Sequence, residues 1–209
     1  MRSLIFILCL LLWTEMYAQD LKLTPKDTAY YTGITRTVIL SDNFDDDRNG
    51  WIGVLHPPAT VFIKGGIFYL KKGTESSWGI DLIIDYSREF EIEFAAKLEN
   101  KSILGDAMLM WGSDCDIDGE TVFYFNKSAL HMTTYVAGEW KDMRRYHKSL
   151  PATEWYTYRI RKVGKEYHVF VNENYVFSYP YTKLNGRRIA FQGRRVNVMV
   201  DDIRISYLN

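Results

Sequence analysis

The stretch Asp116-Ile117-Asp118-Gly119-Glu120 places three carboxylates at alternate positions. In an extended strand, alternate side chains point to the same face and stand about 6.5–7 Å apart. A pair of carboxylates that flanks a sugar carries out glycoside hydrolysis, one as general acid and the other as nucleophile or base. Asp116 and Glu120 are therefore the candidate catalytic residues of this chain.

The same five residues also suit a polar hairpin turn between Trp111 and Val122. Asp and Gly are typical turn residues, and a glycine such as Gly119 weakens the interior of a strand. We favour the turn. We therefore expect a binding protein rather than an enzyme, with hydrolysis by Asp116 and Glu120 as the alternative.

Aromatic side chains are abundant, at 15% of the residues. Sugar rings stack their C–H faces on flat aromatic rings, and polar groups around the rim then bind the hydroxyls. The central segment contains four candidates for ligand contact: Trp111, Tyr124, Tyr135 and Trp140. The alternative is a core position, because tryptophans in β-sandwiches usually fill the core.

The elements that would carry these residues are strands. In Glu89–Phe94, acidic and apolar residues alternate, which is typical of a strand with one face in the core and the other in water. Thr157–Arg161 repeats the pattern, and Gly164 supplies the turn of a hairpin into Tyr167–Val171. Further strands are expected at Ile34–Leu40, Thr60–Leu70, Trp78–Ile84, Ala107–Trp111, Thr121–Phe125, Leu130–Val136, Arg188–Gln192 and Asn197–Tyr207. So many short strands predict an all-β sandwich or barrel.

The last expected strand changes phase in its middle. The apolar residues of 196–200 and those of 203–207 alternate with opposite parity, and the change falls at Asp201-Asp202. A one-residue bulge there would keep both apolar sets in the core. It would also place a carboxylate beside disrupted backbone carbonyls, a setting that suits a hard cation such as Ca²⁺.

The N-terminus has the pattern of a secretory signal peptide. One arginine precedes the apolar run Leu4–Trp13, and a small residue, Ala18, ends the segment. The run is too short to span a membrane, so we expect cleavage after residue 18 and no membrane span in the mature chain. This predicts a signal peptide at 1–18, a lead-in segment at 19–33 and one domain at 34–209, with the protein secreted, periplasmic or at the cell surface.

Composition narrows the class further. The formal net charge is zero, so nothing indicates a nucleic acid partner or an anionic membrane. After cleavage only Cys115 remains, which excludes an internal disulfide and favours a bacterial origin. The four histidines show no zinc-binding spacing.

The order of these features resembles the concanavalin A-like lectin/glucanase superfamily, in particular its bacterial laminin-G-like jelly-roll domains. The resemblance covers roughly residues 38–208, and its motifs are Ser41–Trp51, Met108–Gly112, Val122–Phe125, Glu154–Ile160, Val169–Asn172 and Val200–Ile205. It implies a two-sheet antiparallel jelly-roll sandwich whose first and last strands lie side by side. It is specific for the fold rather than for an activity, because one fold hosts many functions.

The resemblance also implies a structural calcium ion between the first and last strands, at positions that match Asp42 and Asp201. Retaining endoglucanases of the superfamily use a glutamate-x-aspartate-x-glutamate strand, to which 116–120 is similar. This chain departs from that pattern at Asp116, where the shorter side chain would misplace the attacking oxygen by about one methylene.

These observations favour an exported, non-catalytic module that binds a glycan or glycoconjugate, with calcium as structural support. The first alternative is a glycoside hydrolase-like enzyme that uses Asp116 and Glu120. The second is a structural or protein-interaction domain of the cell envelope with no sugar ligand, which an exposed apolar patch or a flat unpaired edge strand would favour.

Overall fold

The computed structural model describes residues 24–27, 30, 32–52, 60–71, 77–99, 105–114, 119–147, 150–151 and 153–209, except the side chain of Asp142. The expected signal peptide, most of the lead-in, Cys115, Asp116 and Asp118 lie outside these residues. Within the described residues, the chain forms no helix that is long and apolar enough to cross a membrane.

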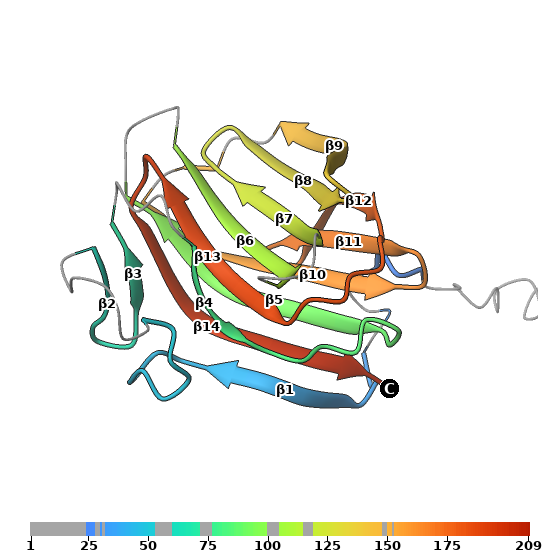
Figure 1. Ribbon diagram of the computed structural model, residues 1–209, viewed down its shortest axis with the longest axis horizontal. Helices are drawn as coiled ribbons and strands as arrows, with labels where there is room; N and C mark the ends of the chain where they lie inside the picture. Colours follow the sequence, from blue (N-terminus) through green and yellow to red (C-terminus); the bar gives the residue numbers. More distant parts are fainter. Residues whose placement is uncertain are drawn as a thin grey trace, which may run out of the picture.

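Two antiparallel sheets form the described part of the domain (Figure 1). The eight-stranded sheet has the order β12-β11-β10-β5-β14-β3-β2, with β1 also paired to β14. The six-stranded sheet has the order β4-β13-β6-β7-β8-β9. The strands are β1 (Arg36–Asp42), β2 (Val61–Ile63), β3 (Phe68–Leu70), β4 (Trp78–Asp81), β5 (Phe90–Leu98), β6 (Asp106–Ser113), β7 (Gly119–Phe125), β8 (Ala129–Val136), β9 (Glu139–His147), β10 (Tyr156–Val163), β11 (Glu166–Val171), β12 (Asn174–Pro180), β13 (Arg188–Arg194) and β14 (Val198–Leu208).

The expected all-β sandwich is confirmed, and the first and last strands pair as the resemblance implied. β1 runs along β14 in antiparallel register, with Asp42 opposite Ile203 (Figure 1). Some boundaries differ from the expectation. Residues 60–70 form the short hairpin β2–β3 rather than one strand, because Gly65 and Gly66 both adopt positive φ in its turn. The edge strand β9 was not expected.

The core lies between the two sheets and is rich in aromatic residues. In β5, Phe90, Ile92 and Phe94 are fully buried, and Glu91 and Glu93 point to the outer face, as the alternation predicted. That face is not fully in water as expected, because Arg161 and other arginines cover Glu91. The ring of Phe94 contacts residues of three other strands: Phe125, Tyr158 and Phe191. Burial of each such side chain contributes about 2–3 kcal/mol to the free energy of unfolding.

The phase change in the last strand is a bulge, as predicted. The register between β14 and β5 shifts between Asp201 and Arg204, and Asp202 has a φ of 50°. Val200 and Ile203 are three positions apart, so a regular strand would place them on opposite faces. The bulge turns both side chains into the core, where both are fully buried. The lead-in residues 24–27 lie against the eight-stranded sheet, where Arg161 donates to the backbone carbonyls of Pro25 and Asp27.

Candidate functional site

The outer face of the six-stranded sheet carries most of the residues singled out in the sequence. Glu120 on β7 lies opposite Tyr135 on β8, which lies opposite Trp140 on β9. Residues paired across antiparallel strands project from the same face and contact one another. The rings of Tyr135 and Trp140 are 5.1 Å apart, and Trp140 is 54% exposed. A carboxylate and two aromatic rings thus form one row across three strands.

A second row crosses the same face four residues further along β7. Tyr124 lies opposite Met108 on β6 and His131 on β8. The rings of Tyr124 and His131 stack at 4.2 Å with an interplanar angle of 21°. At a rise of about 3.3 Å per residue, the two rows stand about 13 Å apart along the strands.

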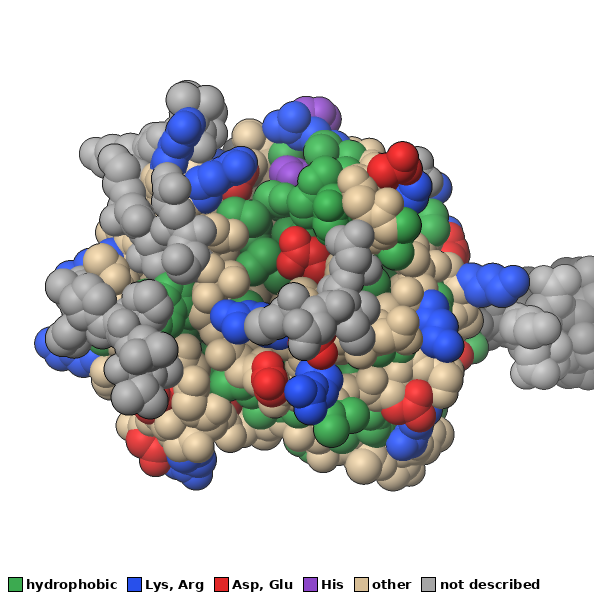
Figure 2. All heavy atoms as spheres, in the orientation of Figure 1, with side chains coloured by type: hydrophobic (Ala, Val, Ile, Leu, Met, Phe, Trp, Pro, Cys, Tyr) green, Lys and Arg blue, Asp and Glu red, His purple; other side chains and the backbone are tan. Residues whose placement is uncertain are grey.

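The floor between the two rows is apolar. Ala190, Met110 and Val122 occupy paired positions on β13, β6 and β7, and with Met108 they form a cluster separate from the inter-sheet core. Thr133 continues this line on β8, and its hydroxyl donates to the backbone carbonyl of Lys141. Figure 2 shows hydrophobic side chains gathered over β6, β7 and β8, with acidic and histidine side chains among them.

Polar groups flank the second row. Asp106 accepts hydrogen bonds from Asn126 at 2.8 Å and from Arg194 at 2.7 Å. The Nδ1 atom of His131 is buried and has no hydrogen-bond partner among the described residues. Burial lowers the pKa of His131, an effect partly offset by Asp106, so the ring is neutral at pH 7.

Glu120 is the member of the expected catalytic pair that the structure describes. It is half-buried on β7 and faces outward with Tyr124, rather than projecting from a turn. Burial raises the pKa of its carboxyl group. Its expected partner, Asp116, lies outside the described residues.

Trp111 lies on the opposite side of β6 from the candidate surface, and we correct its assignment as a ligand contact. Its side chain is fully buried between the sheets, and its indole nitrogen donates to the hydroxyl of Tyr167 at 3.2 Å. A fully buried side chain cannot stack on a sugar. Tyr124, Tyr135 and Trp140 are the expected aromatics that reach the outer face.

The sequence reasoning missed His131 and the apolar floor. One signal for the floor was present, since 107–111 is apolar at every position. A strand with a continuous apolar run buries both of its faces. Leu109 and Trp111 point into the core between the sheets, and Met108 and Met110 point to the outer face of β6, where they form the apolar floor. A lone histidine carries no comparable signal.

The two expected calcium ligands are in different settings. Asp42 is buried, and its carboxylate accepts from the backbone N–H of Phe44 and from the side chains of Asn49 and Trp51, at 2.8, 2.5 and 2.8 Å. These three donors satisfy it without a cation. Burial and the neighbouring Asp202, with a smaller contribution from Asp45, raise the pKa of Asp201. The described residues contain no group of three acidic, histidine or cysteine side chains arranged to hold a metal.

Comparisons with known proteins identify the fold. No family model and no curated protein matches the chain. The laminarinase from Rhodothermus marinus is 14% identical with a TM-score of 0.61, over 84% of this chain and 99% of that one. The catalytic domain of an endo-1,3-beta-glucanase (laminarinase) from Thermotoga petrophila RKU-1 is 13% identical with a TM-score of 0.61, over 83% and 98%. The CBM2 module of the evolved Dit of Lactobacillus casei BL23 phage J-1 is 14% identical with a TM-score of 0.59, over 84% and 97%.

At this level of identity the comparisons define the architecture alone. The chain has the concanavalin A-like lectin/glucanase fold, which confirms the resemblance read from its motifs. Carbohydrate-binding modules and glucanases share this fold, so the fold does not decide between binding and catalysis.

Proposed function

We propose that this protein is a non-catalytic carbohydrate-binding domain whose ligand lies across the outer face of the six-stranded sheet. The observation that carries the proposal is the row formed by Glu120, Tyr135 and Trp140, which places a carboxylate beside two aromatic rings. Aromatic rings contact the C–H faces of sugars, and a carboxylate accepts hydrogen bonds from their hydroxyls.

The rest of the face supports the same ligand class. The apolar floor at Met110 and Val122 suits the non-polar side of a sugar chain, and Tyr124 and His131 stand beyond it as a second set of contacts. The 13 Å between the rows, estimated from the strand rise, is longer than one sugar ring, so an oligosaccharide fits better than a monosaccharide. The floor between the rows is formed by the apolar side chains of Ala190, Met110 and Val122, so we propose a neutral glycan.

The similar structures guide the choice of probe. Two of them are named as laminarinases, one of these as an endo-1,3-beta-glucanase, and the third as a CBM2 module. Laminari-oligosaccharides are therefore the first ligands to test by titration calorimetry of the purified protein, followed by cello- and galacto-oligosaccharides. Absence of binding to all of them would count against the proposal.

Trp140→Ala is the matched test of the surface. We expect about a five- to thirtyfold loss of affinity, because stacking of a sugar ring on an exposed aromatic side chain contributes on the order of 1–2 kcal/mol. Trp155→Ala is the control, since Trp155 is 39% exposed but precedes β10 of the other sheet. Equal affinity in the Trp140→Ala variant and the wild type would place the ligand elsewhere.

Glycoside hydrolysis is the second candidate, and the position of Glu120 is what favours it. A half-buried carboxyl group with a raised pKa is suited to act as general acid. Release of reducing sugar from laminarin by the wild type, abolished by Glu120→Gln, would establish catalysis. Binding without hydrolysis at high protein concentration would support the non-catalytic proposal.

We also propose that the protein is exported and that any calcium ion it binds is structural. Of the two expected ligands, Asp201 is the better candidate, because the carboxylate of Asp42 is already satisfied by three donors. Chelation of calcium should then lower the melting temperature of the wild type but not that of Asp201→Asn. An identical melting temperature with calcium and with chelator would contradict the calcium proposal.

A further inference from the structure

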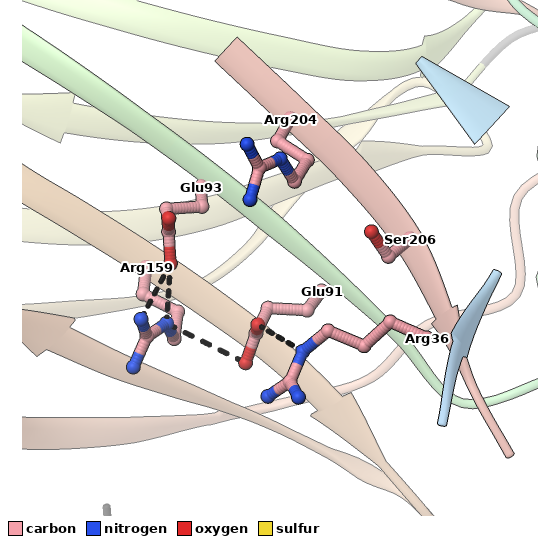
Figure 3. Close-up of a pocket in the computed structure, with 6 residues that line it drawn as sticks. All are labelled: Arg36, Glu91, Glu93, Arg159, Arg204 and Ser206. Carbon is pink, nitrogen blue, oxygen red and sulfur yellow. Dashed lines mark hydrogen bonds and ion pairs between the residues drawn. The ribbon is translucent and has the colours of Figure 1, made fainter. Parts of the chain in front are cut away.

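A second hollow lies on the outer face of the eight-stranded sheet, on the opposite side of the sandwich from the proposed glycan surface. Its volume is about 280 Å³. Side chains from β1, β5, β10 and β14 line it (Figure 3): Arg36, Glu91, Glu93, Arg159, Arg204 and Ser206. We call this hollow the arginine cleft.

Two of the lining residues, Glu91 and Glu93, already have arginine partners. Glu91 is 5% exposed and accepts a hydrogen bond of 2.8 Å from Arg161, with Arg36 and Arg159 at 3.5 and 3.6 Å. Glu93 pairs with Arg159 at 2.5 Å. These ion pairs neutralise both carboxylates, so neither needs a ligand.

Two groups on β14 are not matched in this way. Arg204 forms no ion pair with any residue that the structure describes. The Ser206 side chain is 2% exposed, and its hydroxyl has no hydrogen-bond partner in the described part of the chain. Figure 3 shows both side chains projecting from β14 over the same hollow. A buried hydroxyl without a partner is unfavourable, so Ser206 indicates a missing hydrogen-bond acceptor. The exposed guanidinium group of Arg204 can pair with the same acceptor.

The charge of the lining indicates what that acceptor is. Three arginines and two glutamates line the cleft, which leaves one positive charge in excess. A monoanion would neutralise it, whereas a dianion would leave the cleft with a net negative charge. A carboxylate matches the planar fork of a guanidinium group, and it can also accept a hydrogen bond from a hydroxyl.

We propose that the arginine cleft binds the carboxylate group of a small organic acid, held by Arg204 and by the hydroxyl of Ser206. Its volume is just below the range of roughly 300–1,000 Å³ that drug-sized ligands occupy, so the ligand is small. This site is separate from the proposed glycan surface and does not depend on it.

The test is a titration of the purified protein with sodium acetate at pH 7. The response is measured as changes in NMR amide shifts and in melting temperature. Sodium chloride at equal ionic strength is the reference, and sodium sulfate is the dianion arm. We expect acetate to raise the melting temperature and to shift the amide resonances of β14, and sulfate to have a weaker effect. An acetate response no greater than that of chloride, or a stronger one for sulfate, would overturn the proposal.

Two variants test the assigned groups. Arg204→Gln and Ser206→Ala should each lower the affinity for acetate by about tenfold, because each removes one charge-assisted hydrogen bond. Ser206→Ala should fold normally, because it deletes a buried hydroxyl that has no partner. Arg187→Gln is the control, since Arg187 is exposed and lies next to β13 of the other sheet.

The variants also separate this proposal from the glycan proposal. Trp140→Ala should leave the acetate response intact, and Ser206→Ala should leave oligosaccharide binding intact. If Ser206→Ala binds acetate as tightly as the wild type, the response is general attraction to surface arginines, and the assigned site is wrong.

Discussion

The indole nitrogen of Trp51 donates a 2.8 Å hydrogen bond to the carboxylate of Asp42, and both side chains are buried. This contact closes the loop that follows β1 onto the core, where Trp51 packs against Phe44, Phe68 and Phe191. Asn49 and the backbone of Phe44 donate to the same carboxylate. Asp42 is therefore a structural acceptor for three donors.

Replacement of this carboxylate should destabilise the domain. In Asp42→Asn, an amide NH₂ group would face donors that have lost their acceptor, at a cost of about 2–3 kcal/mol in the free energy of unfolding. Urea unfolding of the variant, in chelator, measures the loss. Asp46→Asn is the control, because Asp46 is exposed and pairs only with Arg48 among the residues described. Equal stability of the two variants would contradict a structural role for Asp42.

The core position of Trp111 predicts a stability effect without a binding effect. Trp111→Phe removes the hydrogen bond to Tyr167 and leaves a small cavity, at a cost of about 1–3 kcal/mol. Oligosaccharide affinity of the folded variant, measured well below its melting temperature, should equal that of the wild type. A specific loss of affinity in a stably folded Trp111→Phe protein would show that this side chain acts on the binding face.

Glu120 should make stability depend on pH in a defined direction. Burial raises the pKa of Glu120 above its ordinary value of 4.5, so the folded state holds this proton more tightly than the unfolded state. Between 4.5 and the raised value, its contribution to stability falls as pH rises.

The variant Glu120→Gln tests this pH dependence, because glutamine does not ionise and so avoids the loss of stability that ionised, half-buried Glu120 causes. The variant should be at least as stable as the wild type at pH 7, and its advantage should shrink at pH 4, where the wild-type carboxyl is protonated in both states. Unfolding curves at the two pH values measure the difference. A variant that is less stable at pH 7 would indicate that the carboxylate has a stabilising partner.

His131 should act in the opposite direction. Burial lowers its pKa below the ordinary 6.5, so the unfolded state binds the proton first as pH falls. Its contribution to stability is therefore present above pH 6.5 and is lost below that value. His131→Gln should flatten the fall in melting temperature between pH 7 and pH 5. His168, whose pKa burial also lowers, should account for the part of the slope that persists.

Much of the fold could be predicted from residue order. The alternation in β5 and the phase change at Asp201-Asp202 were sufficient to predict a core-facing set and an outward-facing set of side chains, and a bulge, because the side-chain period of a strand is two. The hairpin between β10 and β11 followed from Gly164, which has a φ of 55°. The edge strand β9 was missed because its charged residues do not alternate with apolar ones.

The site could be predicted only in part. Tyr124, Tyr135 and Trp140 were identified as binding candidates from their chemistry, but the same reasoning included Trp111, which lies in the core. Residue type does not reveal which face of a strand a side chain occupies when both faces are apolar. That choice depends on which neighbouring strand supplies the covering residues.

By itself, the order of residues determined that this chain is all-β and that its two sheets share an apolar interior. This was possible because the alternation of apolar and polar side chains is a local property of consecutive residues. The tertiary structure alone decided that Glu120, Tyr135 and Trp140 stand in one row, and that Arg204 and Ser206 face the same cleft as Arg36. Those relationships arise from strand pairing, which brings distant residues into register, and no local pattern encodes them.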